Sequence, residues 1–158
     1  MVGELPPEAA GNGPDERRDW SSRRGDAAAE HVAARERVRA SESLQARQLV
    51  EQFVREAVAR GLRQTPLRAR AYNGRSTYRT PLRGWYLKRN ATLAVDGDAN
   101  FYVMSTATSL RARIAGAVIA PADPPLVVGA GGRDGESMPL EELLRIRLEA
   151  GNDWTAAT

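Results

Sequence analysis

The chain has 158 residues and a net charge of +3, with 42% hydrophobic and 27% charged residues. This length and composition predict one globular domain with tails, and they exclude a wholly disordered chain. The absence of cysteine excludes disulfides, iron–sulfur clusters and thiolate zinc sites. No apolar run approaches the ~20 residues of a membrane span, and residues 1–14 lack the features of a signal peptide. We therefore expect a cytoplasmic protein with no membrane partner.

The N-terminal third is expected to change from a flexible arm into a helix. Residues 1–25 are rich in glycine, proline, glutamate and arginine, and such a composition buries too little apolar surface to fold. Within residues 44–60, apolar side chains recur at three- and four-residue spacing, which predicts an amphipathic helix. We expect this helix to begin at Asp26 or near Ser41 and to end at Gly61. The expected organisation is a disordered arm, a helical or partly ordered extension and one globular domain, over residues 1–25, 26–43 and 44–154.

The middle of the chain is expected to form strands. Residues 67–72 and 75–80 alternate in character and flank Asn73-Gly74, the dipeptide typical of a type I′ hairpin turn. A three-strand meander should follow, over residues 85–89, 92–95 and 101–105. The alternate apolar positions of the meander can share one face, which the preceding helix would cover.

The C-terminal third is expected to contain two helices. Ser109 is placed to cap a short helical turn through Ala115, and Ser137 to cap a final amphipathic helix that ends before Gly151. A short strand is expected over residues 126–129. The sequence thus predicts an α+β fold: an N-terminal helix packed on a mainly antiparallel sheet, made of a hairpin plus a three-strand meander, with a C-terminal helix.

Two loops contain residue types found in binding sites. Gly131, Gly132 and Arg133 lie between a strand and a helix, where glycine loops can bind anions, but a flexible connector is the competing interpretation. The segment Asp96–Asn100 has the first ligands of a calcium loop, yet Phe101 stands in place of its glycine. A polar hairpin turn explains that segment better. We expect no metal and no cofactor.

Charge is segregated along the chain. Residues 1–56 carry a net charge of −2 and residues 96–158 of −4, whereas Ala57–Val95 has nine basic residues and no acidic one. In this acid-free span the basic residues are interleaved with aromatic ones, a combination that suits phosphates and unpaired bases. The candidate binding residues are Arg68, Arg70, Tyr72, Arg75, Arg79, Arg83, Lys88 and Arg89.

The hairpin geometry arranges part of this set on one face. A two-residue turn places Arg68 opposite Arg79, Arg70 opposite Thr77, and Tyr72 at the turn end of the same face. Such a like-charge pair is unfavourable unless an anion lies over it. The competing interpretation is that the arginines only solvate the sheet or pair with acids elsewhere.

No nucleophile, base or metal shell can be named, so we expect a non-catalytic module rather than an enzyme. Its expected partner is anionic, RNA or DNA, bound through the Arg/aromatic sheet. The alternative is a protein-interaction or assembly module that uses its long helix or meets an acidic protein surface. A small-ligand or enzymatic role for the Gly129–Ser137 loop ranks below both.

Overall fold

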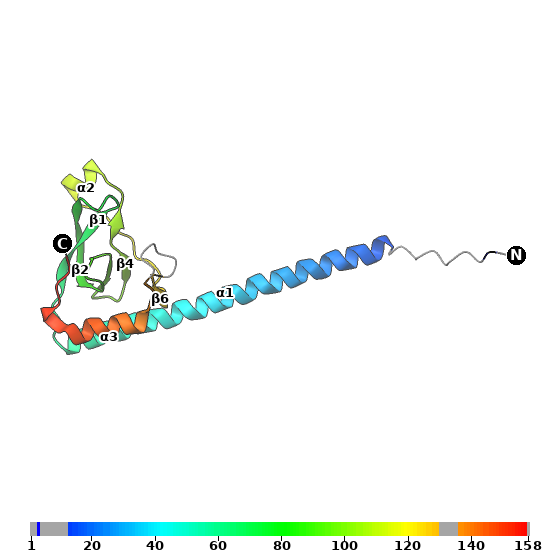
Figure 1. The fold of residues 1–158 in the computed structure, drawn as a ribbon, viewed down its shortest axis with the longest axis horizontal. Helices are drawn as coiled ribbons and strands as arrows, with labels where there is room; N and C mark the ends of the chain where they lie inside the picture. Colours follow the sequence, from blue (N-terminus) through cyan, green and yellow to red (C-terminus); the bar gives the residue numbers. More distant parts are fainter. Residues whose placement is uncertain (1–2, 4–12, 130–135, 158) are drawn as a thin grey trace. The chain divides into compact units, whose positions relative to one another are not determined.

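The computed structural model describes residue 3, residues 13–129 and residues 136–157. The chain divides into two compact units, Met1–Ala40 and Ser41–Thr158. No helix in these described ranges combines the length and apolar character needed to cross a membrane. The elements, labelled in Figure 1, are α1 (Pro14–Ala59), β1 (Thr65–Ala71), β2 (Thr77–Tyr86), β3 (Leu93–Asp96), β4 (Phe101–Val103), β5 (Ser105–Thr106), α2 (Leu110–Ala115), β6 (Val127–Val128), β7 (Met138–Pro139), α3 (Leu140–Ala150) and the 3-10 helix Gly151–Asp153.

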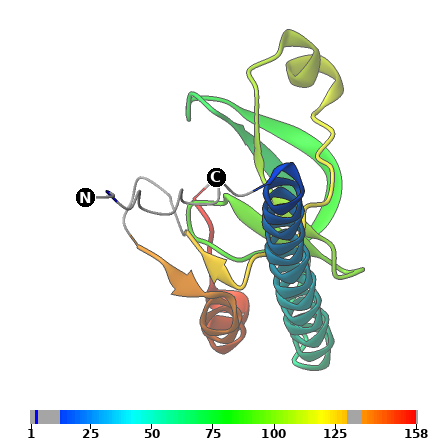
Figure 2. The same cartoon turned by 90° about the vertical axis from the view of Figure 1, so that its right-hand side faces the viewer.

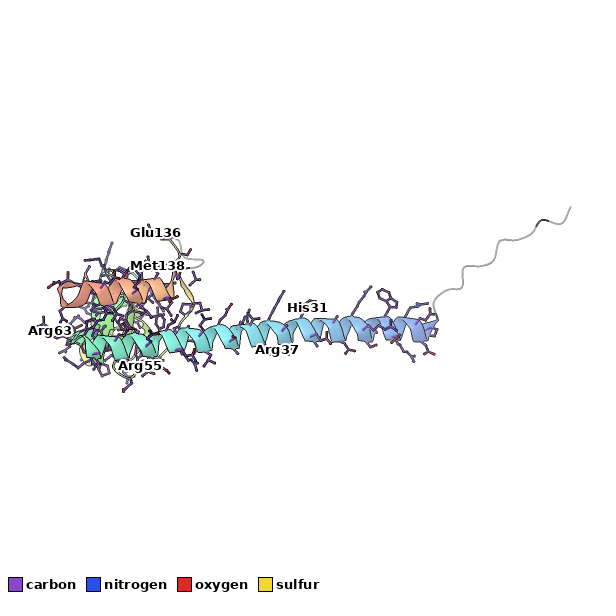
Figure 3. All side chains as sticks on the ribbon, turned by 90° about the horizontal axis from the view of Figure 1, so that it is seen from below. His31, Arg37, Arg55, Arg63, Glu136 and Met138 are labelled. Atoms are coloured by element: carbon purple, nitrogen blue, oxygen red, sulfur yellow. The ribbon has the colours of Figure 1, made fainter. Side chains whose placement is uncertain are left out.

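Helix α1 begins at Pro14, earlier than either start that the sequence suggested. Proline is favoured at the beginning of a helix, and the acidic Asp15 and Glu16 in the first turn favour the positive end of the helix dipole. Every residue from 14 to 40 is solvent-exposed, and Figure 3 shows side chains projecting all along this stretch. The part of the expected arm before Gly13, except Gly3, lies outside the described residues.

The C-terminal part of α1 packs on the sheet through the apolar face that its sequence predicts. Ala46, Val50 and Ala57 are fully buried, and Phe53 meets the Trp85 ring edge-on at 5.9 Å. The helix ends at Ala59, and Gly61 forms its expected cap: a φ of +70° at Gly61 turns the chain so that the Leu62 amide bonds the carbonyl of Ala57 at 2.9 Å. This end of the helix therefore belongs to the core.

The five-stranded sheet has the order β4-β3-β2-β1-β5 and closes on itself. Its two edge strands, β4 and β5, are consecutive in the chain and separated only by Met104. The Met104 amide bonds the carbonyl of Thr92, and its carbonyl accepts the amide of Arg70, each at 2.8 Å. One chain segment therefore joins β3 on one side to β1 on the other, and the sheet forms a small barrel.

Each side of the barrel wall has its own apolar cluster. On the outside, Trp85, Leu87 and Val95 pack with α1 and with α3. On the inside, Tyr78, Tyr86 and other buried residues fill the barrel. Figure 2 shows α1 and α3 on the same side of the curled sheet. The expected fold, a helix on a mainly antiparallel sheet with a C-terminal helix, is confirmed.

The structure differs from the sequence expectations at three boundaries. The first predicted meander strand is the continuation of β2, which runs without a break through Pro81. The hairpin turn is not type I′, because only Gly74 has a positive φ, whereas Asn73 accepts the amide of Arg75 through its side chain at 3.0 Å. Ser137 does not cap α3, since Pro139 occupies the N-cap position and the Leu140 amide bonds the carbonyl of Leu126.

Candidate functional site

The β1–β2 hairpin has the register that the sequence predicts. Arg68 faces Arg79 and Arg70 faces Thr77 across the antiparallel pair. In β1, Ala69 lies between Arg68 and Arg70 and is fully buried inside the barrel. The outer side of the hairpin consequently carries the arginines, as the alternation of a strand requires.

A bulge near Pro66 fixes the backbone around Arg68. The pairing of β1 with β2 shifts register here and resumes at Pro66 and Arg83. Two side chains bond the β1 backbone beside the bulge: the Tyr86 hydroxyl accepts the Arg68 amide at 2.6 Å, and the Thr80 hydroxyl donates to the Leu67 carbonyl at 2.6 Å. The position of Arg68 on the outer side is thus set by buried contacts.

We define the cationic face as the exposed hairpin residues Arg68, Arg75, Arg79 and Arg83 together with Tyr72. The Tyr72 side chain is 76% exposed beside the turn. Among the described residues, none of the four arginines lies within ion-pair distance of a carboxylate. Their hydrogen bonds are long and go to uncharged acceptors. Arg68 Nε donates to the Thr77 hydroxyl at 3.4 Å, and Arg83 donates to the Gln64 carbonyl at 3.4 Å.

The ion pairs of the described residues all involve arginines outside this face. Arg47 pairs with Asp123, Arg60 pairs with Glu56, and Arg145 lies between Glu142 and Glu149. Two further pairs, Arg18–Asp15 and Arg23–Asp19, lie within the first turns of α1. The positive charge of the hairpin is therefore not neutralised by the carboxylates that the structure describes.

Two other predicted site residues, Arg70 and Arg89, contact the C-terminal segment. Arg70 is half-buried and donates to the carbonyl of Ala157 at 3.1 Å. The Arg89 guanidinium lies 6.0 Å from the centre of the Trp154 ring, and Lys88 is half-buried. Arg70 and Arg89 thus have partners within the chain, and the roles of Arg70, Lys88 and Arg89 in binding remain predictions.

The C-terminal segment was the part that sequence reasoning missed. Arg147 of α3 is buried and donates to the carbonyls of Tyr86 and Gly151, each at 2.9 Å, and burial lowers its pKa. Its guanidinium lies 4.5 Å from the centre of the Trp154 ring. The sequence did contain a signal for this contact, because Arg147 lies among the apolar positions of a predicted amphipathic helix. A buried arginine at such a position needs partners for its charge.

The Asp96–Asn100 segment is a polar turn between β3 and β4. One oxygen of Asp96 accepts the amides of Asp98 and Asn100, and the other accepts the Asn100 side-chain amide and the Tyr102 hydroxyl, all within 3.0 Å. The carboxylate of Asp96 is thus used for the turn. Gly131, Gly132 and Arg133 lie outside the described residues, and their role as a ligand loop remains a prediction.

Comparisons with known proteins return no match: no family model, no curated protein and no solved structure is similar to the chain. The geometry of the cationic face is therefore the basis for a proposed function.

Proposed function

We propose that this chain is a non-catalytic binding module that recognises RNA or DNA through the cationic face of the β1–β2 hairpin. The observation that carries the proposal is the direct pairing of Arg68 with Arg79 on adjacent strands. Like charges at such positions disfavour the fold by a few tenths to about 1 kcal/mol. A phosphate placed over the pair converts this repulsion into two favourable contacts.

The chemistry of the face suits a nucleic acid strand. Guanidinium groups bind phosphate oxygens with two parallel hydrogen bonds. The flexible backbone of a single strand can place its phosphates at the spacing of the arginine side chains. Tyr72 at the turn end of the hairpin presents its ring to solvent, and an aromatic ring of this kind stacks on unpaired bases without sequence preference. Single-stranded RNA or DNA is therefore the preferred form of the partner.

The test measures affinity for a fluorescent single-stranded oligouridine by anisotropy at several salt concentrations. The variant Arg68→Gln/Arg79→Gln should bind at least tenfold more weakly, and its slope of log affinity against log salt should fall by ~0.7, since one neutralised phosphate of a single strand contributes ~0.7. Its melting temperature should be equal to or slightly above that of the parent because the like-charge pair is gone. Arg70 is left intact because it bonds the C-terminal segment.

The matched control is Arg39→Gln/Arg55→Gln, which removes the same charge from exposed positions of α1. Arg55 is labelled in Figure 3. This control should retain most of the affinity. Equal losses in both double variants would mean that only net charge matters, and an unchanged affinity of the hairpin variant would refute the proposal.

A second function, assembly through the N-terminal unit, is favoured by one observation. Residues 14–40 are helical although all of them are exposed, and an isolated helix of this kind is only marginally stable without a partner. If this helix binds another protein chain, its circular dichroism should strengthen with that partner or with concentration. A helix content that is independent of concentration and unchanged by candidate partners would count against this function.

A further inference from the structure

Helix α2 carries the most exposed large aliphatic side chains of the described residues. Leu110 is 76% exposed, Ile114 is 83% exposed and Val118, just after the helix, is 89% exposed. Leu110 and Ile114 are four residues apart, so they lie on the same side of the helix. Single exposed aliphatics are ordinary, but three within one short segment indicate a contact surface.

The exposure does not result from a loose segment. The Ser109 hydroxyl accepts the amide of Ala112, and the amide of Gly116 bonds the Ala112 carbonyl at 3.0 Å. Ala117 is buried, and its amide bonds the Arg79 carbonyl at 2.8 Å along the open edge of β2. The segment is thus fixed at both ends of α2, while its large aliphatic side chains face away from the barrel.

The surroundings of these side chains are positively charged. No acidic residue occurs between Asp98 and Asp123 in the sequence, and Arg111 and Arg113 of α2 are exposed. The amide of Tyr72 bonds the Thr106 carbonyl at 2.9 Å, which places the exposed tyrosine near the start of this segment. Aliphatic tips, arginines and an interfacial aromatic residue are thus gathered at one end of the barrel.

We propose that α2 binds to the surface of a membrane that contains anionic phospholipids, with Leu110, Ile114 and Val118 inserted among the acyl chains. Arg111 and Arg113 would pair with lipid phosphates at the level of the headgroups. Figure 1 shows α2 at the end of the barrel opposite α3. Binding to a membrane surface departs from the expectation of no membrane partner, and it does not require a helix that spans the bilayer.

The aliphatic side chains favour lipid over nucleic acid at this end. Phosphate contacts alone would be served by the arginines, and three aliphatic side chains would gain little against a hydrated nucleic acid backbone. A bilayer can bind both the aliphatic side chains and the arginines, because apolar insertion and attraction to anionic headgroups both contribute to the binding free energy. The proposal shares Tyr72 with the cationic face and adjoins Arg79, but it assigns no role to the Arg68 and Arg79 side chains, so it does not depend on the nucleic acid proposal.

The test is cosedimentation of the full chain with vesicles of phosphatidylcholine alone and of phosphatidylcholine mixed with phosphatidylglycerol. The parent should bind the anionic vesicles and bind the neutral ones at least tenfold more weakly. Leu110→Gln/Ile114→Gln should lower binding to anionic vesicles at least tenfold while the melting temperature stays the same, since both side chains are exposed. Arg111→Gln/Arg113→Gln should reduce binding and its dependence on salt.

The control Val32→Gln/Val58→Gln removes two exposed aliphatic side chains from α1 and should bind like the parent. Unchanged binding of the α2 aliphatic variant would overturn the proposal, because the contact would then be electrostatic only. Loss of a concentration-dependent dimer in that variant, with no effect on vesicles, would also overturn it and assign the surface to a second copy of the chain. The variant Arg68→Gln/Arg79→Gln separates the two proposals, since it should lose oligouridine binding but retain vesicle binding.

Discussion

Asp96 and Tyr102 show how single residues fix the wall of the barrel. The buried carboxylate of Asp96 receives four hydrogen bonds, one of them from the Tyr102 hydroxyl at 2.9 Å. Both oxygens of the carboxylate are therefore used in the turn. Both residues hold β3 and β4 together at the end where the chain reverses.

The Tyr102 hydroxyl gives the fold a defined sensitivity to alkaline pH. Burial of the ring, followed by its hydrogen bond to Asp96, raises the pKa of Tyr102 from 10.0 to about 12. The folded state therefore keeps the proton longer than the unfolded state does, so this contribution to stability is complete below pH 10 and is lost as pH rises toward 12. Chemical denaturation across this range should show the decline.

The matched variant for that experiment is Tyr102→Phe, which keeps the ring and removes the titrating group. Its stability should be lower at neutral pH, because the Asp96 carboxylate loses a donor, and should fall less steeply between pH 10 and 12. A parent and variant with parallel pH profiles would show that Tyr102 does not titrate in this range.

At the scale of elements, the sequence predicts best what depends on local periodicity. The register of Arg68 with Arg79 follows from the strict alternation of the hairpin, and the cap of α2 follows from Ser109. The type of turn could not be predicted from the local sequence, because the Asn73-Gly74 pair is compatible with more than one loop conformation. Contacts with the rest of the fold determine which one forms. The bulge near Pro66 depends on Tyr86, a residue distant in sequence.

The candidate site was predictable in part for the same reason. Alternation identified the outward arginines of β1 and β2, but not that Arg70 bonds the Ala157 carbonyl. Such contacts join segments far apart in the chain, and no local pattern encodes them. The aliphatic surface of α2 was likewise hidden, because apolar residues in a short helix are usually expected in a core.

The contact of α1 with the sheet depends on Phe53. This side chain is 1% exposed and packs edge-on against Trp85 in the outer cluster. Phe53→Ala should therefore reduce the free energy of unfolding by about 3 to 5 kcal/mol, as large-to-small changes in a core do. Denaturant titration measures the change, and a loss below about 1 kcal/mol would show that α1 is not part of the core.

The exposed Val58 of the same helix provides the comparison. It is 62% exposed, so Val58→Ala should change the stability by no more than about 0.5 kcal/mol. The contrast between the two variants separates loss of packing from any general effect on the propensity of α1 to form a helix.

At the scale of the whole molecule, residues 1–25 are expected to be dispensable for folding of the barrel. Residues 14–25 are exposed throughout, so their removal takes no buried surface from the core. Deletion of residues 1–25 should leave the melting temperature within a few degrees of that of the parent. Thermal unfolding followed by far-UV and near-UV circular dichroism measures the change. A large drop would mean that Trp20 packs on another part of the protein.

Closure of the sheet has a consequence for the newly made chain. In the finished barrel, β5 pairs with β1 at Arg70 and Ala71, and the Arg79 carbonyl of β2 accepts the amide of Ala117, so part of each strand edge is covered. During synthesis, however, the hairpin leaves the ribosome before Ser105 and Thr106 do, and its edge stays open in the interval. We expect the charges of Arg68, Arg70 and Arg79 to repel a second hairpin at that stage and so to disfavour premature aggregation of the nascent chain.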